Sequence, residues 1–241
     1  MKEPFKPLKI TFYLSTPLAL TYPWIFFDGL IAHLYWRKHS PELYRALPSK
    51  VVAKKIGDII PDLPLKRFGP IFHASVSFFD VEGKYVTFIY KKFFGRKLPL
   101  EKMRRRKIDK ARGFFREWRI SLVTVPARKV VFYCNGRAGE IEELLRGLPT
   151  LGKKGAAGFG FIKKFSIEEL GEDCSIVKDG VAMRSIPLSM VEWSSEVVAM
   201  AYKPPYWAKE NVTLCAPPGA HVRLKGSGKA DEKILQTVGG N

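Results

Sequence analysis

A glycine-rich stretch that carries two pairs of lysines is the first part of the chain that suggests binding chemistry. Residues 147–165 read GLPTLGKKGAAGFGFIKKF. Glycine permits positive φ values and lets a backbone approach a ligand closely. Backbone amides beside lysines suit phosphate, the main charge of nucleic acids. The stretch therefore predicts contact with the phosphates of an extended nucleic acid, although a flexible turn with solvated lysines fits the same residues. Its predicted binding residues are Lys153, Lys154, Gly155, Gly158, Phe159 and Gly160.

The elements on either side of this stretch argue against a nucleotide-cofactor site. Residues 139–148 place Ile141, Leu144 and Leu148 at helical spacing, and residues 158–165 favour a strand. The order is therefore helix, loop, strand. A dinucleotide fingerprint or a P-loop runs strand, loop, helix, because the phosphate sits at the amino end of the helix. No cofactor is predicted.

A strongly basic segment is the second feature that suggests binding. Residues 91–119 contain 13 basic and three acidic residues, a net charge of +10 out of +18 for the whole chain. Arginine binds phosphate through two parallel hydrogen bonds, and the interleaved aromatic residues offer stacking faces for unpaired bases. A solvated arm is the plain alternative; a membrane-surface helix is disfavoured because MRRRKIDKAR lacks a broad apolar face. The predicted RNA-binding residues here are Lys102, Arg104, Arg105, Arg106, Lys107, Lys110 and Arg112.

Histidine is the residue type that offers acid–base catalysis in this chain. Of the four histidines, His73 lies on the polar face of a predicted strand and is the best candidate for a general base, with Tyr22 as a speculative partner. The others are His33, His39 and His221. The sequence contains no G-x-S-x-G, no H-E-x-x-H and no clustered metal-ligand spacing. We therefore predict no catalytic residues and no metal, with a metal-independent endoribonuclease as the alternative.

Composition narrows the class of protein. The 241 residues are 46% hydrophobic and carry a formal net charge of +18, which predicts a sizeable core and a polyanionic partner or surface. Residues 17–35 are the most apolar, but Pro23, Asp28 and His33 interrupt them, so no membrane span is expected. Three cysteines without CxxC spacing suit a reducing compartment. With no visible signal peptide, a cytoplasmic protein is expected.

The elements that would position these residues follow a recognisable order. Alternating and helical patterns predict strands at 9–14, 70–80, 86–94, 119–125, 129–134 and 158–165 and helices at 27–38 and 139–148, with Asp28 as an amino cap or first-turn acid. The order up to Phe165 predicts an α+β fold of the ferredoxin-like, RNA-recognition-type βαββαβ class. A basic insertion at 84–125 lies between its second and third strands.

The remaining residues predict a smaller β-rich region. Asp179-Gly180 between β-type residues predicts a hairpin over 175–186, and short strands are expected at 197–202, 212–215 and 221–224. The predicted organisation is a ferredoxin-like domain at 1–168, a β-rich C-terminal region at 169–224 and a flexible tail at 225–241.

Taken together, these residues resemble the RAMP superfamily of CRISPR-associated proteins. The glycine loop GKKGAAGFG between the last helix and last strand, and Phe27-Asp28-Gly29-Leu30 at the start of the first helix, are similar to motifs of that superfamily. The basic insertion resembles the thumb of the subunit that caps the 5′ handle of crRNA. Residues 184–187 (RSIP) and 204–207 (PPYW) resemble the type IV (Csf) version of that Cas-five-like subunit.

The resemblance implies a non-catalytic subunit of a CRISPR effector ribonucleoprotein. The thumb and the glycine loop would hold the 5′ handle of crRNA, and the subunit would cap the backbone filament. The implied protein partners are a backbone (Cas-seven-like) subunit and a large-subunit-like protein. A repeat-RNA endoribonuclease of the same superfamily and a generic RNA-binding protein stay open as alternatives.

Overall fold

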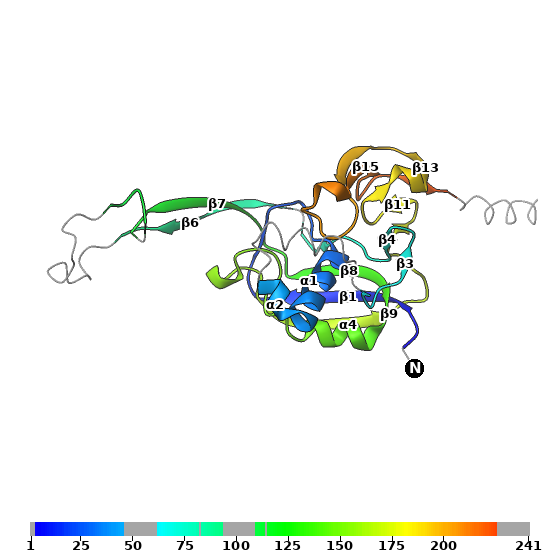
Figure 1. Ribbon diagram of the computed structural model, residues 1–241, viewed down its shortest axis with the longest axis horizontal. Coiled ribbons are helices and arrows are strands. Elements are labelled where there is room, and N and C mark those ends of the chain that lie inside the picture. The colour runs from blue at the N-terminus through cyan, green and yellow to red at the C-terminus, as the bar shows by residue number, and fades with distance from the viewer. Residues whose placement is uncertain (1–2, 46–61, 82, 94–108, 114, 226–241) are drawn as a thin grey trace, which may run out of the picture.

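The computed structural model describes residues 3–45, 62–81, 83–93, 109–113 and 115–225 (Figure 1). The chain is α+β, and its strand pairs are antiparallel. Of the predicted RNA-binding residues, Lys102, Arg104, Arg105, Arg106 and Lys107 lie outside the described residues, as does all of the predicted tail except Lys225.

A four-stranded antiparallel sheet forms the centre of the molecule. Its strands lie in the order β5-β8-β1-β9. Strand β1 is central because it pairs with β8 on one side and β9 on the other. Its apolar residues alternate along the strand, so that Leu8, Ile10 and Phe12 all face one side and are fully buried. The bounds are β1 Lys6–Leu14, β5 Phe78–Phe79, β8 Lys129–Gly136 and β9 Ile162–Glu169.

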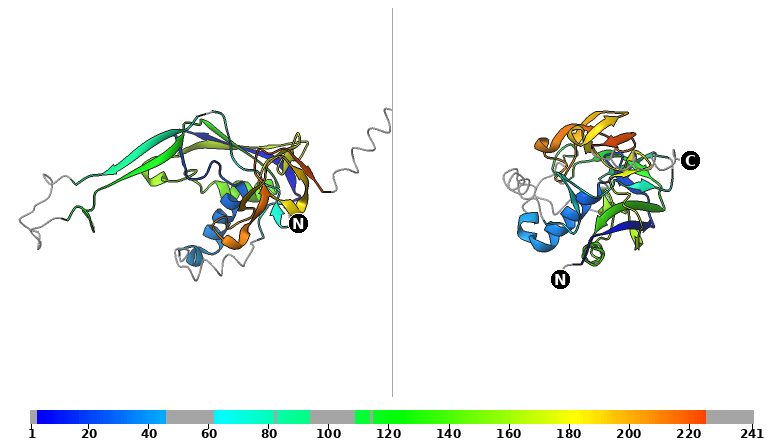
Figure 2. Two further views of the ribbon diagram at one scale, coloured as in Figure 1. Left: turned by 90° about the horizontal axis from the view of Figure 1, so that it is seen from above. Right: turned by 90° about the vertical axis from the view of Figure 1, so that its right-hand side faces the viewer.

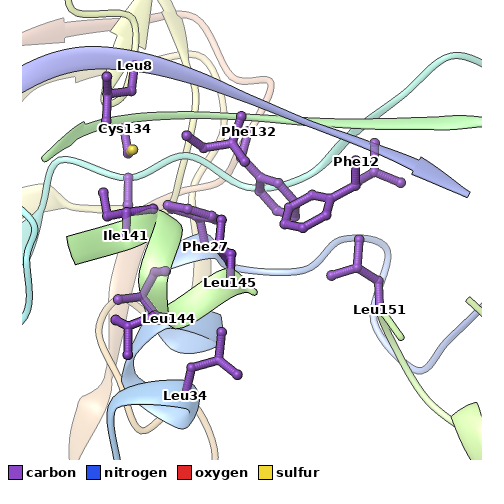
Figure 3. Packing of buried hydrophobic residues seen from close by; sticks show 14 of the residues in the cluster. Leu8, Phe12, Phe27, Leu34, Phe132, Cys134, Ile141, Leu144, Leu145 and Leu151 are labelled. Carbon is purple, nitrogen blue, oxygen red and sulfur yellow. The ribbon is translucent and has the colours of Figure 1, made fainter. Parts of the chain in front are cut away.

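Two helices cover the apolar face of this sheet. Helix α1 (Phe27–His39) contributes Phe27 and α4 (Ala138–Leu145) contributes Ile141 and Leu145 to a single core (Figure 3). Phe132 of β8 is central to that core, because its ring meets Phe27 and also packs edge-on against Phe12, with centroids 5.9 Å apart. We call this sheet with its two helices the body. The short helix α2 (Pro41–Arg45) follows α1.

A two-stranded ribbon projects away from the body. Strands β6 (Tyr85–Lys91) and β7 (Trp118–Val125) pair from Tyr85↔Thr124 to Lys91↔Trp118 and extend outward in Figure 1 and in the left view of Figure 2. At the base of the ribbon, β2 (Leu18–Leu20) adds a third strand through Leu18↔Val125, Ala19↔Thr124 and Leu20↔Val123. The described ends of the basic segment 91–119 therefore lie at the outer end of this ribbon, whose two strands agree with those predicted at 86–94 and 119–125.

The C-terminal region packs around a second, smaller core. Ile186, Ala216 and Val222 lie in this core together with Ile71, which arrives from the N-terminal half. The predicted hairpin is present: Asp179 and Gly180 both have positive φ, 52° and 75°, between β10 and β11. The strands are β3 Arg67–Phe68, β4 Ile71–Phe72, β10 Val177–Lys178, β11 Val181–Ala182, β12 Ile186–Pro187, β13 Val191–Ser194, β14 Val198–Ala201, β15 Val212–Ala216 and β16 Val222–Leu224.

Two predicted strands have different bounds in the structure. The strand predicted at 70–80 is broken into β4, two isolated bridges and β5. The strand predicted at 158–165 begins only at Ile162, because Gly158 and Gly160 have φ values of 93° and 65°. It then continues to Glu169, beyond the predicted end at residue 165. Glu168 and Glu169 form ion pairs with Lys9 and Lys6 across the sheet, so the polar end of β9 suits an exposed face.

In the described part of the chain, no helix has both the length and the apolar character needed to cross a bilayer. The apolar residues 17–35 divide between β2 and the first two turns of α1.

Candidate nucleic-acid interface

The glycine loop, residues 151–161, is an ordered element with unusual backbone geometry. Gly152, Lys154, Gly158 and Gly160 all have positive φ values. Two features favour glycine at position 160. Its φ is 65°, and a Cβ there would lie only 2.0 Å from the carbonyl oxygen of Leu151. Any side chain at that position would push the two arms of the loop apart.

Hydrogen bonds attach this loop to the base of the ribbon. The Leu151 amide donates to the Gly160 carbonyl, and the Gly160 amide donates to the Pro17 carbonyl, both at 2.8 Å. The Lys153 amide donates to the Ala19 carbonyl at 2.8 Å. Ala19 lies in β2, which pairs with β7. The glycine loop and the ribbon are therefore neighbours across a single strand, although about 30 residues separate them in the chain.

The lysines of the loop face solvent without internal partners. Lys153 and Lys154 are exposed, and neither forms an ion pair with any residue that the structure describes. Gly155 and Phe159 are partly exposed at the tip, while Gly160 is buried beneath it. Such a surface offers positive charge to a phosphate chain. The amides of Gly158, Phe159 and Gly160 already donate to carbonyls within the protein, so the loop offers phosphate its lysines and not these three predicted amides.

The ribbon presents an aromatic and basic face. Because strand residues alternate between faces, Val86, Phe88 and Tyr90 share one face with Arg119 of β7. The Arg119 guanidinium lies 3.8 Å from the centroid of the Phe88 ring and 5.7 Å from that of Tyr90. Tyr90 is 54% and Phe88 39% exposed. Arg119 belongs to the basic segment 91–119 but was not among the predicted binding residues, and neither were these rings, although the alternation along β6 is visible in the sequence.

Two predicted binding residues lie near the outer end of the described ribbon. Lys110 contacts Glu117 at 3.6 Å and lies over the Phe93 ring at 6.0 Å, so part of its charge is already paired. Arg112 is exposed. Phe93 also donates its amide to Glu117 at 3.1 Å. These contacts link Phe93, which follows β6, with Lys110 and Glu117, which precede β7.

A buried ionic cluster joins the body to the C-terminal region. Arg184 is fully buried, and its Nη2 lies 3.2 Å from Oδ2 of Asp28. The Tyr206 hydroxyl donates to Oδ1 of Asp28 at 2.6 Å. Arg184 also donates to the carbonyls of Tyr202 and Phe72. Burial alone would lower the pKa of Arg184, but the interactions with Asp28 and Tyr206 together outweigh it and raise that pKa, so the guanidinium stays charged.

This cluster explains three sequence motifs at once. Asp28 comes from FDGL, Arg184 from RSIP and Tyr206 from PPYW. Gly29 is needed beside Asp28 because a Cβ there would lie 3.1 Å from the Tyr206 ring. Asp28 is a first-turn acid, as predicted, but its role is to pair with Arg184 and Tyr206, not to cap the helix. No local pattern announced that these three segments meet.

The structure places the candidate general base in a different network from its suggested partner. Nδ1 of His73 lies 2.8 Å from Oδ2 of Asp173 and 3.3 Å from the Ser175 hydroxyl. Burial would raise the pKa of Asp173, but hydrogen bonds from His73, Ser175 and Asn135 outweigh it and hold that pKa well below its ordinary value. Tyr22, in contrast, lines a cleft beside α1 that does not include His73.

Two of the other histidines, His33 and His39, pack against aromatic rings, whereas His221 is exposed. The His33 ring meets Tyr44 with centroids 5.1 Å apart, and the His39 ring packs on Tyr35. Among the described residues, no group of three or more histidine, cysteine or acidic side chains is arranged to hold a metal ion. Burial raises the pKa of Cys215 to about 11 and that of Cys134 further still, so both are neutral thiols at neutral pH.

Comparison with known families decides the identity of the chain. The model of the family described as CRISPR type IV associated protein Csf3 matches residues 82–218, more than half of the chain. This chain belongs to the Csf3 family. The Csf3 match includes the ribbon, the glycine loop, Arg184 and Tyr206, whereas Asp28 lies before its start.

Other comparisons add little to the Csf3 assignment. A chain in the cryo-EM structure of the type III-B Cmr-beta bound to cognate target RNA is similar at 9% sequence identity, with a TM-score of 0.35. The similarity covers 69% of this chain and 61% of that one, so this chain spans less than two thirds of that neighbour's length. No curated protein matches the sequence.

Proposed function

We propose that this Csf3-family protein is an RNA-binding subunit of a CRISPR effector ribonucleoprotein that holds the 5′ handle of crRNA. The observation that carries the proposal is the contact between the glycine loop and the ribbon. Lys153 donates to Ala19, and Ala19 pairs with Thr124 of β7. The glycine loop therefore adjoins the base of the ribbon through one strand, and the proposed path of the sugar–phosphate chain runs from this loop along the ribbon toward its basic outer end.

The topology of the body supports a ferredoxin-like, RNA-recognition-type fold. Its elements follow in the order β1, α1, β5, β8, α4, β9, with the ribbon between β5 and β8, and the sheet order is β5-β8-β1-β9. That is the βαββαβ order with both helices on one face. Two separate cores support a division into an N-terminal domain to about residue 168, with the ribbon as its insertion at 84–125, and a C-terminal region at 169–224.

Each half of the proposed interface has its own chemistry. The glycine loop supplies the charges of Lys153 and Lys154 to phosphates, which positions RNA without reading its sequence. The ribbon supplies arginine and exposed aromatic rings, on which unpaired bases stack. We also propose that the basic residues at 102–107 extend the cationic path beyond Lys110 and Arg112. Catalysis is not needed for this role.

The same surfaces suggest where protein partners bind. An isolated two-stranded ribbon is marginal in water, and this one exposes Tyr85, Val86 and Tyr90 at 54% or more. We therefore propose that the ribbon is covered in the assembled particle by RNA and by a backbone (Cas-seven-like) subunit. A large-subunit-like protein is the second proposed partner.

The test is an RNA-binding titration with the full chain. A labelled crRNA that carries its 5′ handle is titrated at several salt concentrations, and the slope of log affinity against log salt is measured. Lys153→Ala/Lys154→Ala should weaken binding and flatten the slope by about 0.7 to 1 for each lost phosphate contact. Arg104→Ala/Arg105→Ala/Arg106→Ala should do the same. Lys225→Ala, an exposed lysine beyond β16, is the matched control.

The result also separates the alternatives. Unchanged affinity and slope in both multiple variants would remove these residues from the interface. Equal affinity for unrelated RNAs would favour a generic RNA-binding protein. The pairing of His73 with Asp173 is the one observation that favours an endoribonuclease. Site-specific cleavage of repeat RNA that His73→Ala abolishes would establish that activity.

A further inference from the structure

A cleft of about 480 Å³ lies beside the glycine loop, and nothing in the proposed function uses it. Its walls come from α1 and the segment before it, from β2, from the glycine loop and from the turn at 204–207. Aromatic side chains dominate these walls: Tyr22, Trp24, Phe26, Trp36, Tyr206 and Trp207. The volume falls within the range of sites that enclose small organic ligands, roughly 300–1,000 Å³.

The buried ionic cluster holds one ring in the wall of this cleft, that of Tyr206. The Tyr206 ring stacks on Phe26 at 3.8 Å between centroids and 14° between planes, while its hydroxyl is held by Asp28 and Arg184. Trp24 packs edge-on against Phe26, with centroids 6.5 Å apart. Because Tyr206 is held by Asp28 and Arg184 and stacks on Phe26, these two rings are fixed in position before a planar ligand enters. A preformed site avoids part of the entropic cost of binding.

The charges around the cleft suit a ligand that is linked to phosphate. None of its lining residues is acidic, and Lys153 of the glycine loop lies in its wall. Removal of water from His33, together with the charge of Arg37, lowers the pKa of His33, so this ring is neutral at neutral pH. The cleft is therefore aromatic inside, with one cation from the element that we assign to phosphate.

We propose that the cleft binds one unpaired base of the RNA whose phosphates lie along the glycine loop. The inference rests on the proposed function and deepens it, because it assigns a base-binding site beside the phosphate site. Every base has a π face that stacks on aromatic side chains, and the adjoining phosphate lies within the reach of a lysine in the same wall. An apolar side chain of a protein partner would fill the space but would gain nothing from Lys153.

The experiment combines a variant with a modified RNA. Trp207 is 59% exposed and lines the cleft, whereas Trp193 is 57% exposed and lies on β13 outside it, so Trp207→Leu and Trp193→Leu are matched for folding cost. Each full-length protein is titrated with intact crRNA handle and with a series of handles in which one nucleotide at a time is abasic. Circular dichroism confirms that both variants are folded.

One abasic position should weaken binding to the unaltered protein by roughly 5- to 100-fold, the range expected for the loss of one base–aromatic stack. Trp207→Leu should weaken binding to intact RNA by a similar factor and should make that abasic position neutral. Trp193→Leu should behave as the unaltered protein. This loss of sensitivity at one position identifies a direct base contact, which a general disturbance of the fold would not produce.

Three results would overturn the inference. The base site is wrong if Trp207→Leu binds intact RNA as tightly as Trp193→Leu, or if every abasic position is neutral. If Lys153→Ala/Lys154→Ala still weakens binding in that case, the proposed grip on the handle survives. Loss of a co-purifying protein subunit from Trp207→Leu, with RNA affinity unchanged, would assign the cleft to a protein contact. Failure of the unaltered protein to bind the handle at all would refute the proposed function itself.

Discussion

Phe132 and Phe88 are both phenylalanines on antiparallel strands, but their surroundings differ completely. Phe132 lies in the body, is 0% exposed and meets the rings of Phe12 and Phe27. Phe88 lies on the ribbon, is 39% exposed and has the Arg119 guanidinium 3.8 Å from its centroid. The body satisfies its apolar groups internally, whereas the ribbon leaves rings and charges available to a partner. Substitutions in the body should therefore change mainly the stability of the fold, whereas substitutions on the ribbon should change mainly binding.

The largest effect should come from the buried ionic cluster. Arg184→Met removes the partner of Asp28 and leaves a buried carboxylate uncompensated. We expect the free energy of unfolding to fall by at least the roughly 3–5 kcal/mol typical of a broken buried pair. Chemical denaturation measures the loss. Arg223→Met, at an exposed position in β16, is the control. A loss below about 1 kcal/mol would mean that Arg184 does not join the two regions.

A matched pair of truncations tests the comparison itself. Phe132→Ala should lower the free energy of unfolding by about 3–5 kcal/mol, because it empties part of a packed core. Phe88→Ala should change stability by no more than about 0.5–1 kcal/mol and should weaken RNA binding instead. Denaturation and RNA titration of both variants measure the contrast. Equal stability losses would show that the ribbon is part of the folding core after all.

Two glycines of the same loop should respond differently to alanine. Gly160→Ala brings a Cβ to 2.0 Å from the Leu151 carbonyl and should distort the loop, with a cost of at least about 1–3 kcal/mol and weaker RNA binding. At Gly158 a Cβ meets nothing within 4 Å, so only its φ of 93° opposes the change. Gly158→Ala should cost less, about 1 kcal/mol. If the two variants behave alike in denaturation, the close approach at Gly160 is not what fixes the loop.

The smallest effect concerns pH. The folded-state pKa of Asp173 is depressed, so this carboxylate stabilises the fold above its unfolded pKa of about 4 and loses that contribution as pH falls toward the folded value. Asp173→Asn should therefore flatten the decline in stability between about pH 5 and pH 2. The pKa of Glu117 on the ribbon is also lowered, first by the Phe93 amide, but this group is solvent-exposed. Glu117→Gln should leave the acid profile unchanged; an equal flattening would contradict the distinction.

Local patterns predicted much of the fold. Three local patterns each predicted an element that is present: the alternation in β1, the helical spacing of Ile141, Leu144 and Leu145, and the turn at Asp179-Gly180. Each pattern depends only on the polarity or backbone freedom of neighbouring residues. The strand predicted from residue 158 begins only at Ile162. Phe159 and Phe161 favour a strand, but the positive φ values of Gly158 and Gly160, which the sequence does not reveal, are incompatible with one. The strand at 70–80 was predicted unbroken, because alternation does not report where a strand leaves its partner.

The candidate site was only partly predictable. Glycine and lysine content identified the loop, and charge identified the basic segment, because both properties belong to consecutive residues. Arg119 received no special attention, since its value depends on Phe88 and Tyr90 across the ribbon. The aromatic cleft was not predicted, because its walls come from four separate segments of the chain.

By itself, the sequence determined the composition of this protein: a strongly cationic chain, a glycine loop after a helix, and most of the strands. Only the tertiary structure placed Lys153 against β2, which pairs with β7, and only it brought Asp28 together with Arg184 and Tyr206, the last of them 178 residues away. The reason is physical. Periodicity and turn chemistry depend on a few neighbouring residues. The partner of a buried charge depends on which distant segments pack together when the whole chain folds.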